Sequence, residues 1–361
     1  MKLKSKIIKC FRTAVSIILV GIALFCVCKR FPEVFGQQNT ILAAAAFTLT
    51  DGKYPVESGV AETSAPQQET TSATAATEPT AVPAAAKARD KSGYYDSYAD
   101  HSGEEKYEIA EKTILGDGAK VENCYVKNFA ELSVDFNAAL QKPLTFQVEK
   151  QSKQPQVLIY HTHTGESYMD EDVDFFYDSF YSHTNNNDFN VVAVGEAMKS
   201  VLEKNGIAVL HDTTVHDSSY NGSYDRSVQT VYADMEKYPE IKVVLDIHRD
   251  ALGTDEQKVK TVFEHNGKKG AQIMILSGCD PDNERGFVNW ENNLSFALKL
   301  QSTAEKLYPG MTRPLDFGYF AYNEYVCDGS LLIEIGTDAN AIEEAVYSGE
   351  LLGDVLARVL S

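Results

Sequence analysis

Apolar runs and amphipathic stretches alternate along residues 155–361. Short runs rich in β-branched and aromatic residues predict buried strands at 157–160, 207–210, 242–247 and 331–335. Apolar residues spaced three and four positions apart predict helices at 190–205, 224–238, 290–307 and 341–360. Two more apolar runs flank a glycine-bearing turn and are expected to form either a hairpin or two strands of the sheet, at 259–263 and 272–276.

Strands that alternate with helices predict an α/β fold, in which an open, mainly parallel, twisted sheet carries helices on both faces. The strand at 242–247 is almost continuously apolar, as is typical of a strand that is buried on both sides. We place the main domain at residues 155–361. Residues 106–154 predict a small N-terminal extension packed on it, with β-like pieces at 119–126 and 144–148 and a helix-like piece near 129–140.

The N-terminal third of the chain has a different character. Residues 13–28 form an apolar run behind five basic residues, which predicts a transmembrane helix and a membrane anchor at 1–31. The basic residues place the N-terminus in the cytoplasm and the rest of the chain outside. A cleaved signal peptide is the alternative, because Ala43–Ala46 offers a cleavage site of small residues. Residues 32–105 are rich in Ala, Thr, Ser, Pro and Glu, above all from position 51 onward, and predict a low-complexity, disordered linker.

Charge is unevenly distributed along the chain. Seven of the 33 basic residues lie within the first 30 positions, where there is no acidic residue, so the remainder carries 26 basic and 52 acidic side chains. Such an acidic body excludes electrostatic binding of nucleic acid or of an anionic lipid surface, and it suits a neutral or cationic polymer better. Beyond the N-terminal apolar segment the cysteines have no CxxC or CxxH spacing, which argues against a cysteine zinc site: Cys124, Cys279 and Cys327.

The strand at 157–160 leads directly into His161, His163 and Glu166. Alternate residues of a strand share a face, so we expect His161 and His163 to point the same way, with Cα atoms about 6–7 Å apart. Two imidazoles, with a carboxylate beyond a glycine bend, can close on one metal ion. The alternative is a loop that carries two unrelated, solvent-exposed histidines.

Two later strands carry residues of the same kinds. The strand at 242–247 leads into His248 and Arg249, and the last strand carries Glu334 within an apolar run. In open α/β sheets the site lies beyond the carboxyl ends of the strands, so we expect these residues to meet the first group there. An ionised carboxylate among leucines and isoleucines is costly unless it is paired, which makes Glu334 the most diagnostic single residue.

These residues together indicate a zinc hydrolase. His163 and His248, with one further protein ligand, would leave zinc a fourth position for water, as in catalytic sites. Glu334 is expected to act as the general base, and the alternative is a structural pair with Arg249 or another cation. Arg249 could orient Glu334 or hold an anionic group of the substrate, or it could form an ordinary surface ion pair. Four further histidines have no partner pattern and are expected at the surface: His183, His211, His216 and His265.

The combination of YHTHTGES at 160–167, DIHRD at 246–250 and LLIEIG at 331–336 resembles the stage II sporulation protein P family, over roughly residues 106–361. That family is related to zinc-dependent N-acetylmuramoyl-L-alanine amidases, so the resemblance implies a zinc amidase-like catalytic domain at 155–361. It implies hydrolysis of septal peptidoglycan during engulfment, with amidase and endopeptidase activity, in the space between the membranes. It also implies a complex with sporulation proteins D and M.

The resemblance carries over residue by residue with one gap. The histidine ligands of the amidases fall on His163 and His248, and their catalytic glutamate falls on Glu334. Their glutamate ligand at the start of the first helix has no match, because that register here holds Asn187 or Asp188. Glu166 is the better candidate for the third zinc ligand, with His161 as its competitor.

Two other functions are compatible with the sequence. One is a zinc exopeptidase-like enzyme that acts on free peptides. The other is a non-enzymatic, cell-wall-binding scaffold, which would gain nothing from a buried carboxylate at Glu334.

Overall fold

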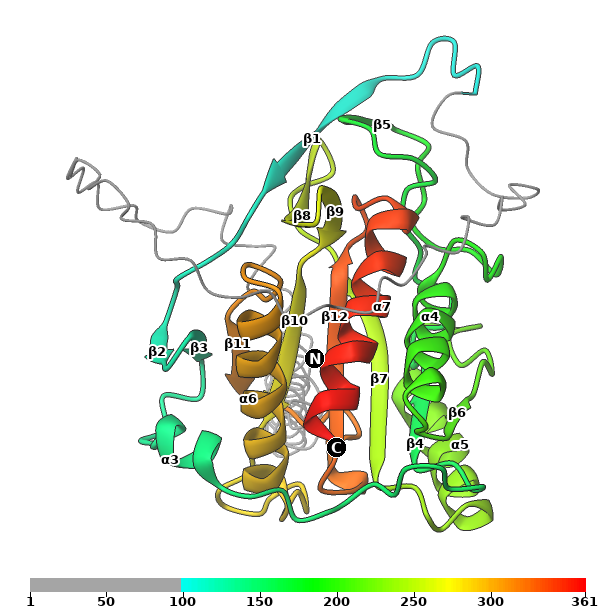
Figure 1. Ribbon diagram of the computed structural model, residues 1–361. Coiled ribbons are helices and arrows are strands. Elements are labelled where there is room, and N and C mark those ends of the chain that lie inside the picture. Colours follow the sequence, from blue (N-terminus) through cyan, green and yellow to red (C-terminus); the bar gives the residue numbers. More distant parts are fainter. Residues whose placement is uncertain (1–98) are drawn as a thin grey trace, which may run out of the picture. The chain divides into compact units, whose positions relative to one another are not determined.

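The computed structural model of the chain describes residues 99–361, which are coloured in Figure 1. The predicted membrane anchor at 1–31 and nearly all of the predicted linker at 32–105 lie outside these residues. None of the helices within the described range is long and apolar enough to cross a membrane.

The strands in chain order are β1 (Lys106–Lys112), β2 (Ala119–Val121), β3 (Cys124–Asn128), β4 (Val157–Tyr160), β5 (Phe175–Tyr177), β6 (Val209–His211), β7 (Val243–Asp250), β8 (Gln257–His265), β9 (Lys268–Ala271), β10 (Ile273–Gly278), β11 (Leu315–Gly318) and β12 (Ser330–Thr337). The helices are α3 (Phe136–Gln141), α4 (Val191–Lys204), α5 (Ser223–Lys237), α6 (Trp290–Leu307), α7 (Ile342–Val359) and the 3₁₀ helix η1 (Glu324–Val326). The four predicted helices and the predicted strands on which the candidate residues depend are confirmed to within a few residues.

The main sheet has the strand order β2-β3-β11-β10-β12-β7-β4-β6 (Figure 1). Strands β12, β7, β4 and β6 pair in parallel, and so do β10, β11 and β3. The two parallel blocks run in opposite directions, because β10 is antiparallel to β12. The sheet is thus mainly parallel, as predicted, but with an antiparallel seam at its centre. The seam arises because the β8–β9 hairpin, and not a crossover helix, returns the chain from β7 to β10.

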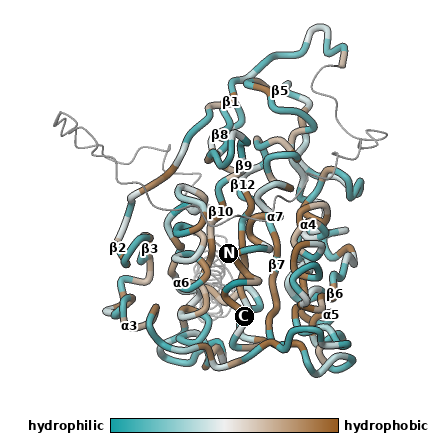
Figure 2. Tube along the Cα trace, viewed as in Figure 1, coloured by the Kyte–Doolittle hydropathy of each residue, from teal (hydrophilic) through white to brown (hydrophobic). Residues whose placement is uncertain are grey.

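One face of this sheet belongs to the main hydrophobic core. Ile247, Ile273 and Ile333 point to this face and pack with apolar residues of α4, α6 and α7. Figure 1 shows these three helices beside one another over the strands, and Figure 2 shows that the central strands are predominantly hydrophobic. The helices therefore stabilise the sheet through its odd-numbered positions on β7, β10 and β12.

The opposite face of the main sheet is only partly covered, by α5. Tyr160 and Val244 pack there with Val231 of α5 on the β4 and β7 side. Farther along the same face, Met274, Asp316 and Glu334 remain partly exposed. Helices therefore lie on both faces, as predicted, and the face that carries α5 also presents polar side chains of the central strands to solvent.

A second, four-stranded sheet has the order β5-β1-β8-β9. Strands β8 and β9 form a hairpin whose turn residues, Asn266 and Gly267, both have positive φ angles of 52° and 73°. The runs at 259–263 and 272–276 are therefore both strands, as predicted, but they neither form a hairpin with each other nor lie in the same sheet. The first run lies in the small sheet and the second begins the central strand β10, because β9 intervenes between them.

Residues 106–154 are interleaved with the main domain. Strand β1 pairs with β8 in the small sheet, and β3 pairs with β11 and so extends the main sheet. Helix α3 packs against α6. The predicted strand at 144–148 is not formed, and residues 99–361 lie within one compact unit without a boundary at residue 154.

The cap at Asn190 helps to hold α4 beside the sheet, and a substitution there tests this role. This fully buried residue caps α4: its Oδ1 accepts from the Val192 N–H at 3.0 Å, and its Nδ2 donates to the Thr184 carbonyl at 3.1 Å. Asn190→Ala leaves both groups unpaired in the interior, so we expect the free energy of unfolding to fall by about 2–3 kcal/mol. Equilibrium urea unfolding measures the loss.

The control for this prediction is Asp135→Ala, which removes the exposed cap of α3. It should cost about 1 kcal/mol or less. Equal losses for the two variants would contradict the view that burial makes the Asn190 cap expensive to remove.

Candidate active site

The register of the central strands places His248 and Glu334 side by side. Glu334 of β12 is the partner of His248 of β7 in the parallel ladder, so both side chains lie on the face that carries α5. His163 and Glu166 reach the same place from the turn that follows β4. Glu166 Oε2 lies 3.3 Å from His248 Nδ1, and the ring centroids of His163 and His248 are 5.4 Å apart. The structure therefore brings these four predicted residues into one group, the His–Glu cluster.

Aromatic contacts hold His163 in place. Its ring stacks on Tyr220, with centroids 4.6 Å apart and planes 8° apart, and it meets Tyr224 edge-on at 5.7 Å. Burial lowers the pKa of His163, which favours the neutral imidazole that binds metals. Its Nδ1 is buried and has no hydrogen-bond partner within the described chain. A shielded ring nitrogen without a partner is costly, and a metal ion would satisfy it.

Glu166 is surrounded by positive charge. Besides its contact with His248, its Oε2 accepts a hydrogen bond from the Arg249 backbone N–H at 3.1 Å. Burial alone would raise the pKa of Glu166, but the charges of His248 and Arg249 lower it to about 2. Glu166 is therefore ionised at neutral pH, as a metal ligand must be.

His248 lies between two carboxylates. Its Nε2 is 2.9 Å from Asp246 Oδ1, although the geometry is not that of a hydrogen bond. Asp246 is itself fixed by Thr162, whose N–H and Oγ1 donate to its two oxygens at 2.8 and 2.6 Å. Burial alone would lower the pKa of His248, but Asp246 and Glu166 hold it well above its usual value. Asp246 had no predicted role, and its position two residues before His248 on the same strand face is the signal that could have revealed one.

Glu334 has different surroundings. It is partly exposed, and its Oε2 is buried without a hydrogen-bond partner among residues 99–361. Burial and the charge of Asp250 raise the pKa of Glu334 to about 8, against the opposing charge of His248. A carboxylate with an unoccupied oxygen and a high proton affinity can accept a proton from water.

Arg249 lies next to Glu166. Its Nε donates to the Ser167 carbonyl at 3.2 Å, its Nη2 donates to the Ser182 carbonyl at 2.8 Å, and its Nη1 is 4.0 Å from Glu166 Oε1. The side chain is only 11% exposed, so the expectation of an ordinary surface ion pair is wrong. Its contacts fix the turn that carries Glu166.

His161 does not join the cluster. Strand β4 ends at Tyr160, so the alternation of strand side chains stops before His161. Its Nδ1 donates to the Ile247 carbonyl at 2.9 Å, and its Nε2 lies 2.9 Å from His211 Nε2, next to Gly195 of α4. The expectation that His161 and His163 point the same way is therefore wrong.

All four histidines expected at the surface have partners, and two of them are buried. The side chain of His211 is 3% exposed, and His216 is 2% exposed and donates from Nδ1 to the His161 carbonyl. His183 Nε2 lies 2.9 Å from Asp217 Oδ2, which also accepts the Gly165 N–H at 3.0 Å. These contacts shape the turn between β4 and α4. They join residues that are far apart in the sequence, so no local sequence pattern predicts them.

Among the candidates for a third ligand, the structure places Glu166 beside His248. Asn187 accepts a hydrogen bond from the side chain of Asn190 at 3.1 Å. The Asp188 N–H donates to Asn186 Oδ1 at 3.1 Å, just before α4 begins. Asn187 and Asp188 therefore shape the approach to α4.

The donor set of the His–Glu cluster fits zinc, which takes imidazole nitrogens and carboxylate oxygens. The unpartnered Nδ1 of His163 and the close approach of Glu166 to His248 support that fit. The candidate ligand atoms of His163, Glu166 and His248 do not all lie within 4.8 Å of one another, the spacing that would let them share one ion. In the described part of the chain a different group of residues meets that spacing. Closure on one ion therefore requires side-chain rotation within the cluster.

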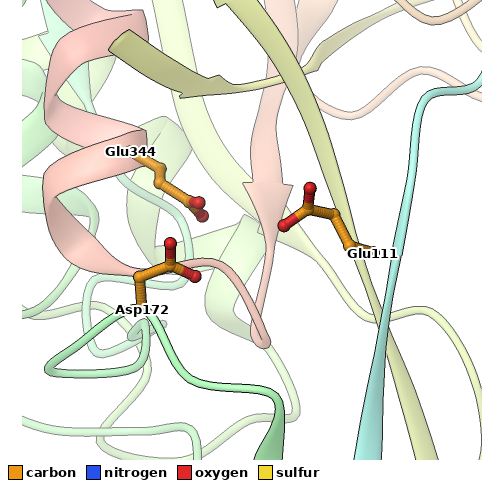
Figure 3. A group of neighbouring side chains, drawn as sticks. All are labelled: Glu111, Asp172 and Glu344. Carbon is orange, nitrogen blue, oxygen red and sulfur yellow. The ribbon is translucent and has the colours of Figure 1, made fainter.

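The group that meets the spacing is the acidic triad of Glu111, Asp172 and Glu344 (Figure 3). Two lysines already reach it. Lys260 Nζ contacts Asp172 and lies 3.3 Å from Glu111 Oε2, and Lys269 Nζ lies 2.7 Å from the same oxygen of Glu111. Although burial alone would raise them, the lysines hold the pKa values of Glu111 and Asp172 below their usual range. The triad is an ion-pair network in which ammonium groups occupy the place of a metal.

Lys260→Met tests this view of the triad. The Lys260 side chain is 4% exposed, whereas its partners Glu111 and Asp172 are 41% and 46% exposed and keep Lys269 as a counter-charge. Its removal takes a nearby positive charge from the buried Glu344, so we expect a loss of about 1–2 kcal/mol in the free energy of unfolding. Lys269→Met removes a side chain that is 34% exposed and should cost about 1 kcal/mol or less. Urea unfolding measures both, and a rise in the Tm of the unaltered protein on adding calcium would show that a metal competes with the lysines.

Comparison with known proteins identifies the family. The sequence matches the family model described as stage II sporulation protein P over residues 34–357. It is 28% identical over 222 residues to stage II sporulation protein P of Bacillus subtilis (strain 168), a match that covers 56% of this chain and 50% of that protein. The chain thus spans about half the length of this curated relative.

Solved structures resemble the chain more distantly. The N-acetylmuramoyl-L-alanine amidase AmiC2 of Nostoc punctiforme is 11% identical, with 58% of this chain and 96% of that chain covered and a TM-score of 0.32. The CwlD amidase from Clostridioides difficile, in complex with the GerS lipoprotein, is 12% identical, with 57% and 98% covered and a TM-score of 0.33. These TM-scores are too low to establish a shared fold. The family match, in contrast, extends over far more than half of the 361 residues, and the chain belongs to the stage II sporulation protein P family.

Proposed function

We propose that the chain is a zinc-dependent peptidoglycan hydrolase of the sporulating cell, with N-acetylmuramoyl-L-alanine amidase activity. The observation that carries the proposal is the His–Glu cluster, in which His163, Glu166, His248 and Glu334 meet on one face of the sheet from three separate segments. Membership of the sporulation family supports a role in cell-wall hydrolysis. The unpartnered groups in the cluster favour an enzyme over a wall-binding scaffold, because they cost stability and a scaffold gains nothing from them.

Each residue of the cluster has a distinct part in this proposal. His163, Glu166 and His248 would hold zinc, which when bound polarises a carbonyl and lowers the pKa of water. Asp246 orients His248, and Tyr220 keeps the ring of His163 in place. Glu334 accepts the proton of the attacking water and delivers it to the leaving nitrogen of the amide.

We further propose that the hydrolase acts outside the cytoplasm from its predicted membrane anchor. The seven basic residues within the first 30 positions support this orientation. The expected complex with sporulation proteins D and M stays a prediction.

Two variants separate metal binding from proton transfer. Glu334→Gln keeps the shape of the side chain but cannot accept a proton, so we expect stoichiometric zinc and a loss of hydrolysis of at least about 100-fold. His163→Ala removes a ligand and should abolish both zinc retention and hydrolysis. Zinc is measured by elemental analysis, and hydrolysis by the release of stem peptides from purified sacculi.

The matched control is His265→Ala, at a histidine beside the turn of the β8–β9 hairpin and outside the His–Glu cluster. It should retain zinc and full activity. Hydrolysis at the normal rate by Glu334→Gln would refute the general-base role, and an absence of zinc from the unaltered protein would refute the metal. Release of free amino acids from short peptides, without release of stem peptides from sacculi, would favour the exopeptidase.

A further inference from the structure

On the face that carries Glu334, a strip of four residues extends away from α5 toward β11. The ladders pair Glu334 with Met274 of β10, and Leu276 of β10 with Asp316 of β11. Met274 and Leu276 are two residues apart, so all four side chains share this face. Asp316 therefore lies on the same surface as the candidate general base, two strands away from it.

Asp316 has no partner of its own in the described chain. Its Oδ1 is buried without a hydrogen-bond partner, although the residue is partly exposed. The neighbouring cations are engaged elsewhere: Arg313 Nη2 lies 2.8 Å from Asp250 Oδ2, and Lys127 Nζ lies 2.8 Å from Asp117 Oδ2. A carboxylate kept in this state costs folding energy, and such local conflicts concentrate at functional sites.

A strained loop borders the strip. Tyr322 and Asn323 have positive φ angles of 35° and 61°, a conformation that costs on the order of 1 kcal/mol or more for each residue. Asn323 Nδ2 holds the loop on α5 by donating to the Tyr224 carbonyl at 3.2 Å and to Ser227 Oγ at 3.1 Å. Tyr322 packs on Tyr224, with ring centroids 5.3 Å apart. Burial and the charges of Asp316 and Glu334 raise the pKa of Tyr322 to about 12.

We propose that Asp316 binds the side-chain ammonium group of the diamino acid in a peptidoglycan stem peptide while the scissile amide lies at Glu334. This inference rests on the proposed function. An ammonium group supplies the charge-assisted hydrogen bonds that the free carboxylate lacks. Two strand spacings and two residues separate the Cα atoms of Glu334 and Asp316, a distance on the order of 12 Å. An extended peptide spans about 3.3–3.6 Å per residue, so the side chain of the third stem residue reaches Asp316.

The test compares two muropeptides with a tripeptide stem, one with a free side-chain amine at its third residue and one with that amine acetylated. Binding is measured by calorimetry on the full chain with Glu334→Gln, so that no substrate is consumed. We expect the free amine to bind about tenfold more tightly, as a charge-assisted hydrogen bond implies. Adding Asp316→Asn should remove this preference by weakening only the free-amine ligand. Equal dissociation constants for the two muropeptides in the presence of Asp316 would overturn the proposal.

Two further variants make the result specific. Asp316→Glu keeps the charge and should retain part of the preference, whereas Asp255→Asn, at an exposed position, should retain all of it. Failure of the unaltered protein to cleave sacculi, with the preference intact, would remove the hydrolase proposal and leave the ammonium site. Cleavage of both muropeptides with the same kcat/KM and the same affinity would keep the hydrolase and remove the role of Asp316.

Asp316 also predicts a pH dependence of stability. Burial and the charge of Asp250 raise the pKa of Asp316 to about 6, against the opposing charges of Lys127 and Arg313, and Tyr322 and Glu334 face the same strip. A carboxyl group with a higher pKa in the folded chain stabilises the fold at low pH, and this contribution is lost as the pH rises through about 6. Asp316→Asn should therefore raise the Tm at pH 8 by about 4 °C, with the difference disappearing below about pH 4. Calorimetric scans measure it, and a difference that does not change with pH would contradict an unpaired charge at this position.

Discussion

The parallel pairing of β7 with β12 places Glu334 beside His248, and the chemistry of the chain depends on this register. A slip of one residue would turn each side chain into the core under α4, α6 and α7, where Ile247 and Ile333 now pack. The same isoleucines prevent the slip, because their burial is lost if they face solvent. The hydrophobic core therefore determines where the candidate catalytic carboxylate points.

Some of the carboxylates in the site have a positive partner within the described residues, and Glu334 does not. Arg249, and His248 with a pKa that Asp246 and Glu166 hold well above its usual value, offset the charges of Asp246 and Glu166, which lie within contact distance of one or both. Glu334 lies beside this balanced group without an ion pair of its own in the described chain, so burial acts on its charge with little compensation. This is why the two glutamates beside His248 have opposite shifts, with the pKa of Glu166 at about 2 and that of Glu334 at about 8.

The sequence was sufficient for the elements with strong periodicity and for site residues at strand ends. His163, Glu166, His248 and Glu334 were predicted together because strand ends of an open sheet meet at one edge. The prediction for His161 is wrong because the strand ends one residue before it, and a sequence does not define strand boundaries to the residue. The antiparallel seam between β10 and β12 depends on a hairpin in a second sheet, and the position of Asp316 depends on two ladder registers. Neither is encoded in a local pattern.

Two groups of acids in this chain show what separates a structural carboxylate from a candidate functional one. In the acidic triad, Glu111 and Asp172 contact lysines, and one oxygen of Glu344 accepts hydrogen bonds from Asn340 and Ala341. Glu334 and Asp316 have neither a hydrogen bond nor an ion pair within residues 99–361, and both lie on the one partly open face of the sheet. A cluster of acids does not by itself indicate a metal site, because lysines of the same fold can lie among the carboxylates and neutralise them. A more informative feature is a carboxylate that has no partner and lies beside an open surface. Its unpaired charge costs folding stability, and a bound ligand would supply the missing partner.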